Sequence, residues 1–116
     1  MYEYRATITR VIDGDTYEAE IDLGFFVTLK RQRVRLLGVD TPEVFGRNRD
    51  EVRGPAATTF VALWVDACGG SVVLKTHKAL KKSGDEKQSL DRWLAEVFNP
   101  DGESLAEAII EAGHVK

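Results

Sequence analysis

The chain has 116 residues, of which 43% are hydrophobic and 30% are charged, and its formal net charge is -3. This length suits one domain around one core, and this composition is that of a globular protein rather than a disordered or fibrous one. The small negative charge argues against a general nucleic-acid coat protein, for which a strongly basic surface would be expected. We therefore expect a single domain over residues 1–116, present as a monomer.

Cysteine usage and hydropathy argue against a disulfide-stabilised protein and against a membrane-spanning one. Cys68 is the single cysteine, so no internal disulfide can form, and we expect it to be a small core residue. No apolar run approaches the roughly 20 residues that cross a bilayer, and residues 1–5 lack a signal segment. We expect no membrane association and a cytoplasmic location by default, or a secreted one if a signal was removed before this numbering.

The first part of the chain predicts strands. Residues 4–12 alternate in a β-branched pattern, Asp13-Gly14 gives a turn signal, and residues 16–22 resume the alternation, which indicates a hairpin. Leu23-Gly24 breaks this pattern. Residues 25–29 then predict a short strand and residues 32–39 a longer one, which Pro42 ends.

The second part alternates helices with strands. Residues 44–53 predict a mobile loop, and a helix follows from Pro55 to the Gly69-Gly70 stop, with Phe60 and Trp64 on its core-facing side. The remaining expected elements are a strand at 71–76, a lysine-rich loop at 79–89, a strand at 92–98, a turn at 99–102 and a short helix at 105–112. The pattern predicts a mainly β protein of about five strands. It does not distinguish a small closed barrel from another antiparallel sheet packed on helices.

Two charged motifs indicate chemistry. Asp13-Gly14-Asp15-Thr16 supplies carboxylates at a turn, and the stretch from Arg35 to Glu43, RLLGVDTPE, runs from a cation into two more carboxylates. Clustered carboxylates concentrate a hard cation such as Ca²⁺ or Mg²⁺, while a guanidinium matches the oxygens of a phosphodiester. A phosphate-cleaving metal site is therefore the leading hypothesis.

These motifs, with a later RWLAEVF from Arg92 to Phe98, resemble the staphylococcal nuclease (thermonuclease) family over roughly Val11 to Gly113. The resemblance implies an α+β, mainly β fold: a five-stranded OB-fold Greek-key barrel with one long helix after strand 3 and a short C-terminal helix. It also implies a Ca²⁺-dependent endonuclease that hydrolyses DNA and RNA with little sequence preference and leaves 3′-phosphate ends. The expected partners are single-stranded or locally melted DNA and RNA.

The resemblance assigns the ion and the water to four residues. Asp15, Asp40 and the backbone carbonyl of Thr41 hold Ca²⁺, and Glu43 is the general base or the carboxylate that orients the attacking water. Ca²⁺ takes six to eight oxygen ligands, so these few protein ligands leave room for water and a phosphate oxygen. Taken alone, Asp13-Gly14-Asp15 is typical of a plain hairpin turn, and Glu43 of an exposed loop glutamate; Asp13 keeps the turn role.

Arg35 and Arg92 correspond to the phosphate-binding arginines of the family, whose guanidinium groups would stabilise the charge that develops on the phosphate oxygens. The alternative is two surface arginines with local ion pairs. The sequence departs from the family ahead of Arg92, where residues 88–91 read QSLD. The sequence given ends at Lys116, so we expect the aromatic substrate contacts that follow Gly113 in the family to be absent or supplied elsewhere. Tyr17 and Phe45 are candidates for base stacking, with a structural role as the alternative.

Two other functions are compatible with this sequence. One is a nuclease-like OB-fold module that binds nucleic acid or protein without catalysis. The other is a domain in which Ca²⁺ only stabilises the fold. The presence of Asp15, Arg35, Asp40 and Glu43 together favours the enzyme.

Overall fold

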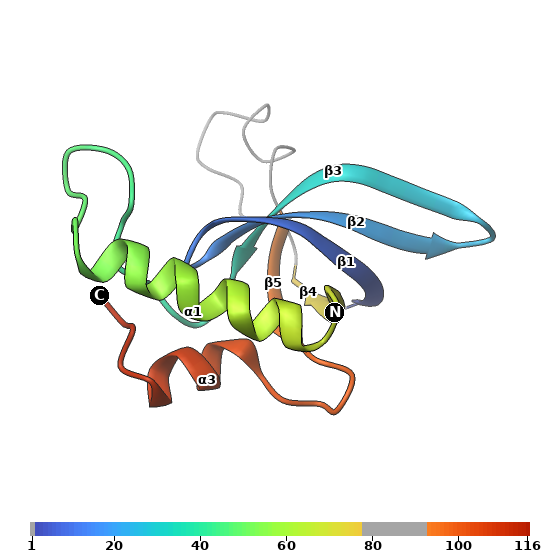
Figure 1. Cartoon of the computed structure of the whole chain (residues 1–116). Helices are drawn as coiled ribbons and strands as arrows, with labels where there is room; N and C mark the ends of the chain where they lie inside the picture. The colour runs from blue at the N-terminus through green and yellow to red at the C-terminus, as the bar shows by residue number, and fades with distance from the viewer. Residues whose placement is uncertain (1, 78–92) are drawn as a thin grey trace.

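Five strands and two helices make up the part of the chain that the structure, a computed structural model, describes: residues 2–77 and 93–116. In chain order they are β1 (Tyr2–Asp13), β2 (Thr16–Gly24), β3 (Val27–Leu36), α1 (Arg53–Ala67), β4 (Ser71–Thr76), β5 (Trp93–Phe98) and α3 (Leu105–Glu111). The fold is therefore mainly β, as the sequence predicted, with α1 between the third and fourth strands (Figure 1).

The sheet closes on itself, in the order β1-β2-β3-β5-β4 with β4 paired back to β1. All neighbouring pairs are antiparallel except β3 with β5, which is parallel. The pairing of β2 with β3 sets Thr16 opposite Arg35. The β1–β2 turn therefore lies beside the end of β3, although about 20 residues of chain separate them.

The core lies inside the closed sheet and under the two helices. Alternate residues of each strand point inward, because successive side chains of a strand face opposite sides. The fully buried members with the largest side chains are Tyr17, Ile21, Leu36, Leu74, Leu105 and Ile109. Helix α1 packs on β1 and α3, and Figure 1 shows the two helices side by side. Phe60 and Trp64 are partly buried against this core, which confirms their expected packing role.

One strand stands where two were expected between residues 25 and 39. Phe25 and Phe26 form the turn between β2 and β3, with φ of 54° and 62°, and β3 then runs unbroken to Leu36. The prediction was wrong because turns with two left-handed residues are normally built from Asn and Gly, so two phenylalanines gave no turn signal. The expected break near Arg31, whose φ is 56°, is a bulge within the single strand.

The end of β3 also differs from the prediction. The strand ends at Leu36 rather than Val39, and Gly38, with φ of 96°, turns the chain away from the sheet. Pro42 is therefore not the residue that ends the strand. Residues 37–43 form an irregular segment, and Asp40, Thr41 and Glu43 project from it rather than from a strand.

The remaining expectations have mixed outcomes. β4 spans the predicted residues, and β5 begins at Trp93, so Arg92 and the lysine-rich loop lie outside the described residues. Cys68 follows α1, packs against the core and donates a hydrogen bond from its thiol to the carbonyl of Val65. As the single cysteine it cannot form an internal disulfide. Neither of the described helices has the length and apolar character needed to span a membrane.

Candidate functional site

A pocket of about 310 Å³ opens where the β1–β2 turn, the end of β3 and the irregular segment after it come together. Among the described residues, those that line it are Asp13, Asp15, Thr16, Arg35, Asp40, Thr41, Glu43, Phe45 and Lys116. Five of the six residues that the sequence assigned to a site are therefore gathered here. The sixth, Arg92, lies outside the described residues.

The β1–β2 turn is pressed against the irregular segment by Gly14. A Cβ atom added at Gly14 would lie 2.4 Å from Oγ1 of Thr41, so only glycine allows this approach. The buried hydroxyl of Tyr17 donates to the carbonyl of Gly14 at 2.6 Å and fixes the turn from below. The turn role expected for Asp13 is confirmed, because its carboxylate accepts a bond from the amide of Asp15 at 3.1 Å.

Asp15 lies in this turn and is buried. It is only 9% exposed, and its Oδ2 accepts a hydrogen bond from the amide of Thr41 at 3.1 Å. Burial raises the pKa of the Asp15 carboxyl, assisted by the neighbouring Asp13, while the Thr41 amide and Arg35 act in the opposite direction. An ionised carboxylate is therefore unfavourable here unless further positive charge compensates it.

Arg35 lies between two of the candidate ligands. Its guanidinium is 3.2 Å from Oδ2 of Asp15 and forms a second ion pair with Oδ1 of Asp40. It also donates to the carbonyls of Leu36 at 3.0 Å and Val39 at 3.2 Å, which holds the irregular segment in place. In this arrangement a single guanidinium is shared by two carboxylates, and the pKa of Asp15 remains raised.

Thr41 lines the pocket and carries a buried hydroxyl that lies against Gly14. Its side chain is 2% exposed, and its Oγ1 has no hydrogen-bond partner among the described residues. A buried hydroxyl is normally bonded to protein, water or a ligand.

The donor set of the pocket fits a hard cation in part. Carboxylate, carbonyl and hydroxyl oxygens are the ligands that Ca²⁺ and Mg²⁺ prefer. Within residues 2–77 and 93–116, however, no three carboxylate, histidine or cysteine side chains converge so that they could hold an ion. A cation bound between Asp15 and Asp40 would need backbone oxygens and water as well.

Glu43 has a partner that the sequence did not reveal. Nζ of Lys116 lies 3.3 Å from its Oε1, and the amide of Lys116 donates to the carbonyl of Asp40 at 2.9 Å. Arg53 holds the same C-terminal segment through the carbonyl of Val115. Because 73 residues separate Glu43 from Lys116, no local pattern could have indicated this contact.

The start of α1 fixes the backbone of Glu43. The amide of Asp50 donates to the Glu43 carbonyl at 2.8 Å, and a Cβ added at Gly54 would lie 2.4 Å from that oxygen. The Asp50 carboxylate accepts from the amides of Val52 and Arg53, and these bonds lower its pKa. An acidic residue just before a helix is a known capping signal, so the bonds to the Asp50 carboxylate could have been predicted from the sequence, whereas the bond to Glu43 could not.

The two aromatic residues suggested for base stacking differ in their exposure to solvent. Tyr17 is fully buried, so its suggested role in base stacking is wrong and the structural alternative holds. Phe45 lines the pocket and is 63% exposed. It is the described aromatic residue that a ligand in the pocket would meet.

Neither the family models of known proteins nor the curated proteins include a match to this chain. The family resemblance therefore depends on the quoted motifs alone, and the geometry of the pocket carries the functional argument.

Proposed function

We propose that this protein is a Ca²⁺-dependent phosphodiesterase that cleaves single-stranded or locally melted DNA and RNA with little sequence preference. The observation that carries the proposal is the convergence of Asp15, Arg35, Asp40, Thr41 and Glu43 on one pocket from separate parts of the chain. A purely structural ion site would need the carboxylates but not a guanidinium and a further, partly exposed glutamate beside them.

The reaction would be attack of water on phosphorus. The water oxygen forms a bond to phosphorus, the bond from phosphorus to the 5′-oxygen breaks, and the leaving oxygen takes up a proton, which gives a 3′-phosphate and a 5′-hydroxyl. Glu43 would accept the proton of the attacking water. Its carboxylate is partly exposed at the pocket wall, its backbone is fixed by Asp50, and Lys116 holds one of its oxygens.

Arg35 would stabilise the charge on the phosphate oxygens. Its present partners, Asp15 and Asp40, are the two carboxylates proposed to bind the cation. A bound Ca²⁺ would supply positive charge to these carboxylates and to a phosphate oxygen. With such an ion held by Asp15 and Asp40, the Arg35 guanidinium would be available to bind a phosphate oxygen. Arg92 is proposed as the second phosphate-binding arginine, on the resemblance.

We also propose that the closed sheet is a Greek-key barrel of the OB type. The support is the number of strands, the strand order and the long helix between the third and fourth strands. OB folds commonly bind single-stranded nucleic acid along a positively charged groove, which agrees with the proposed substrate.

The test is hydrolysis of single-stranded DNA by the purified protein in millimolar Ca²⁺, with EDTA as the metal-free comparison. Glu43→Gln keeps the size and hydrogen-bonding capacity of the side chain but removes the base. We expect it to lower kcat by roughly 10²- to 10⁴-fold while binding of the substrate is retained.

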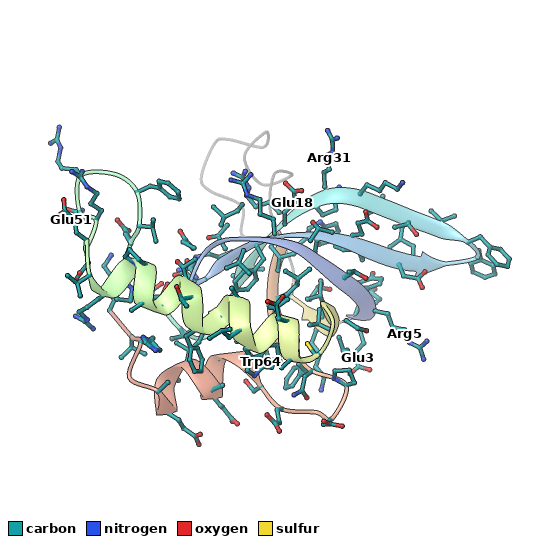
Figure 2. All side chains as sticks on the ribbon, viewed as in Figure 1. Glu3, Arg5, Glu18, Arg31, Glu51 and Trp64 are labelled. Carbon is teal, nitrogen blue, oxygen red and sulfur yellow. The ribbon has the colours of Figure 1, made fainter. Side chains whose placement is uncertain are left out.

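Glu51→Gln is the matched control. Glu51 lies on the same loop, with its side chain 79% exposed and outside the pocket lining (Figure 2). The Glu51→Gln variant should cleave single-stranded DNA at the wild-type rate. Intact DNA with and without EDTA would contradict the proposal; if the DNA were still bound, the catalytically inactive binding module would be supported instead.

A further inference from the structure

We propose that Phe45 forms a nucleobase subsite at the rim of the pocket, where its ring stacks on the base next to the phosphate being cleaved. This inference rests on the proposed function and names the part of the substrate, beyond the phosphate, that the site binds.

The exposure of Phe45 is the first argument. The ring is 63% exposed, so folding gains little from it, yet it stands in a pocket whose other described lining residues are charged or carry a hydroxyl. An aromatic ring beside phosphate-binding groups is the combination that single-stranded nucleic-acid sites use. Phe25 and Phe26 are still more exposed, but they form the turn at the far end of the β2–β3 hairpin and do not line this pocket (Figure 1).

The position of Phe45 in the chain is the second argument. It follows Glu43 by two residues, and two residues of chain span at most about 7 Å. The loop that carries it is closed at its base, because the amide of Asp50 donates to the carbonyl of Glu43 at 2.8 Å. The carbonyl of Gly46 accepts bonds from the amide and the guanidinium of Arg49, at 3.4 and 3.2 Å. The ring is therefore tied to the carboxylate that would orient the water, and a base stacked on it would belong to a nucleotide next to the reacting phosphate.

The size of the pocket is the third argument. A volume of about 310 Å³ is at the lower end of the range for small-molecule sites, which is roughly 300–1,000 Å³. The charged floor suits a phosphate and its cation, so the adjoining base would be left at the rim, where Phe45 lies. A phenyl ring has no donor or acceptor with which to read base edges, so this subsite would accept any base.

The experiment compares two eight-nucleotide substrates with the same phosphates: a thymidine octamer, and an octamer of abasic sugars. Initial rates in millimolar Ca²⁺ give kcat and KM for the wild type, Phe45→Ala and Phe45→Trp. We expect Phe45→Ala to lower kcat/KM on the thymidine octamer by about 5- to 150-fold, mainly through KM, which is the usual range for one lost base stack. It should have no effect on the abasic octamer, and Phe45→Trp should retain the wild-type value on both.

Phe25→Ala, which removes another exposed phenylalanine, is the matched control and should behave as the wild type on both substrates. An equal loss by Phe45→Ala on the two octamers would mean that the residue only supports the loop, and no loss on either would mean that no base stacks there; both results overturn the inference. If the wild type cleaved neither octamer, the proposed function would fail. The same four proteins would then be compared by equilibrium binding of the two octamers, where the inference requires Phe45→Ala to weaken only the thymidine complex.

Discussion

Asp15 is the residue whose surroundings most clearly conflict with its charge. It is buried, a second aspartate adjoins it, and its pKa is raised for these reasons even though Arg35 and the Thr41 amide stabilise the anion. Such conflicts are concentrated at functional sites, because a group tuned for a ligand is seldom tuned for stability. The same physics makes stability depend on pH in a defined direction.

Replacing Asp15 by asparagine should stabilise the protein in EDTA at neutral pH, by an amount of order 1 kcal/mol. Because the folded-state pKa of Asp15 lies above its ordinary value of 3.8, the folded protein binds this proton more tightly than the unfolded chain does. The stability of the wild type therefore falls, relative to Asp15→Asn, as pH rises from about that value through the raised pKa, and the difference is constant above it. Urea denaturation of both proteins across this range would measure the difference.

Asp66→Asn, at an exposed position on α1, is the control for the change of one aspartate to asparagine. If the difference in the free energy of unfolding between Asp15→Asn and the wild type became smaller as pH rose, the assignment of a raised pKa would be contradicted.

The turn of the β2–β3 hairpin has an unfavourable backbone conformation. Its two turn residues, Phe25 and Phe26, have left-handed backbone angles and side chains that are almost wholly exposed. Left-handed backbone costs a residue other than glycine roughly 1–2 kcal/mol, and no packing offsets it at this tip. Beyond the turn, β3 contains a bulge in which two residues, Lys30 and Arg31, lie opposite one residue of β2, Glu20. After this bulge, Val34 faces the core and Arg35 faces the pocket. Arg31 itself projects into solvent (Figure 2).

Replacing Phe25-Phe26 by Asn-Gly should therefore raise the free energy of unfolding by about 1 kcal/mol, after allowance for the greater freedom of glycine in the unfolded chain. Thermal denaturation measures the gain. Replacement by Ala-Ala removes the same rings but leaves the backbone angles unfavourable, and it should change stability by less than about 0.5 kcal/mol. Equal gains from the two variants would show that the rings, and not the backbone, are responsible.

At the scale of the whole molecule, the site is assembled from distant parts of one chain. The β1–β2 turn, the segment after β3, the start of α1 and the C-terminal Lys116 all meet at it. A cation bound between Asp15 and Asp40 would therefore link segments that are distant in the chain, and its binding free energy would add to the stability of the fold.

Ca²⁺ at about 100 times its dissociation constant should accordingly stabilise the protein by about 2.7 kcal/mol, a rise in Tm of roughly 10 °C. A thermal melt with and without Ca²⁺ measures this rise. In Asp40→Asn the effect should be largely lost, whereas Asp66→Asn should keep it. A rise of the same size in Asp40→Asn would show that the ion binds elsewhere.

The sequence alone determined most of the elements and the candidate residues of the site. Alternation and turn residues predicted the first two strands, β4, β5 and both helices, because the repeat of two or 3.6 residues is a local property of the chain. The approach of carboxylates to an arginine within Arg35 to Glu43 was visible for the same reason. Local signals failed where residues other than glycine adopt left-handed backbone angles, as at Phe25 and Phe26.

Only the tertiary structure decided which residues meet. The pairing of Thr16 with Arg35 brings Asp15 to the arginine, and the path of the C-terminal segment brings Lys116 to Glu43. Burial removed Tyr17 from the candidate contacts and left Phe45 at the rim. These contacts depend on how the sheet closes and how the helices pack against it, which is a property of all the strands together and not of any one stretch of sequence.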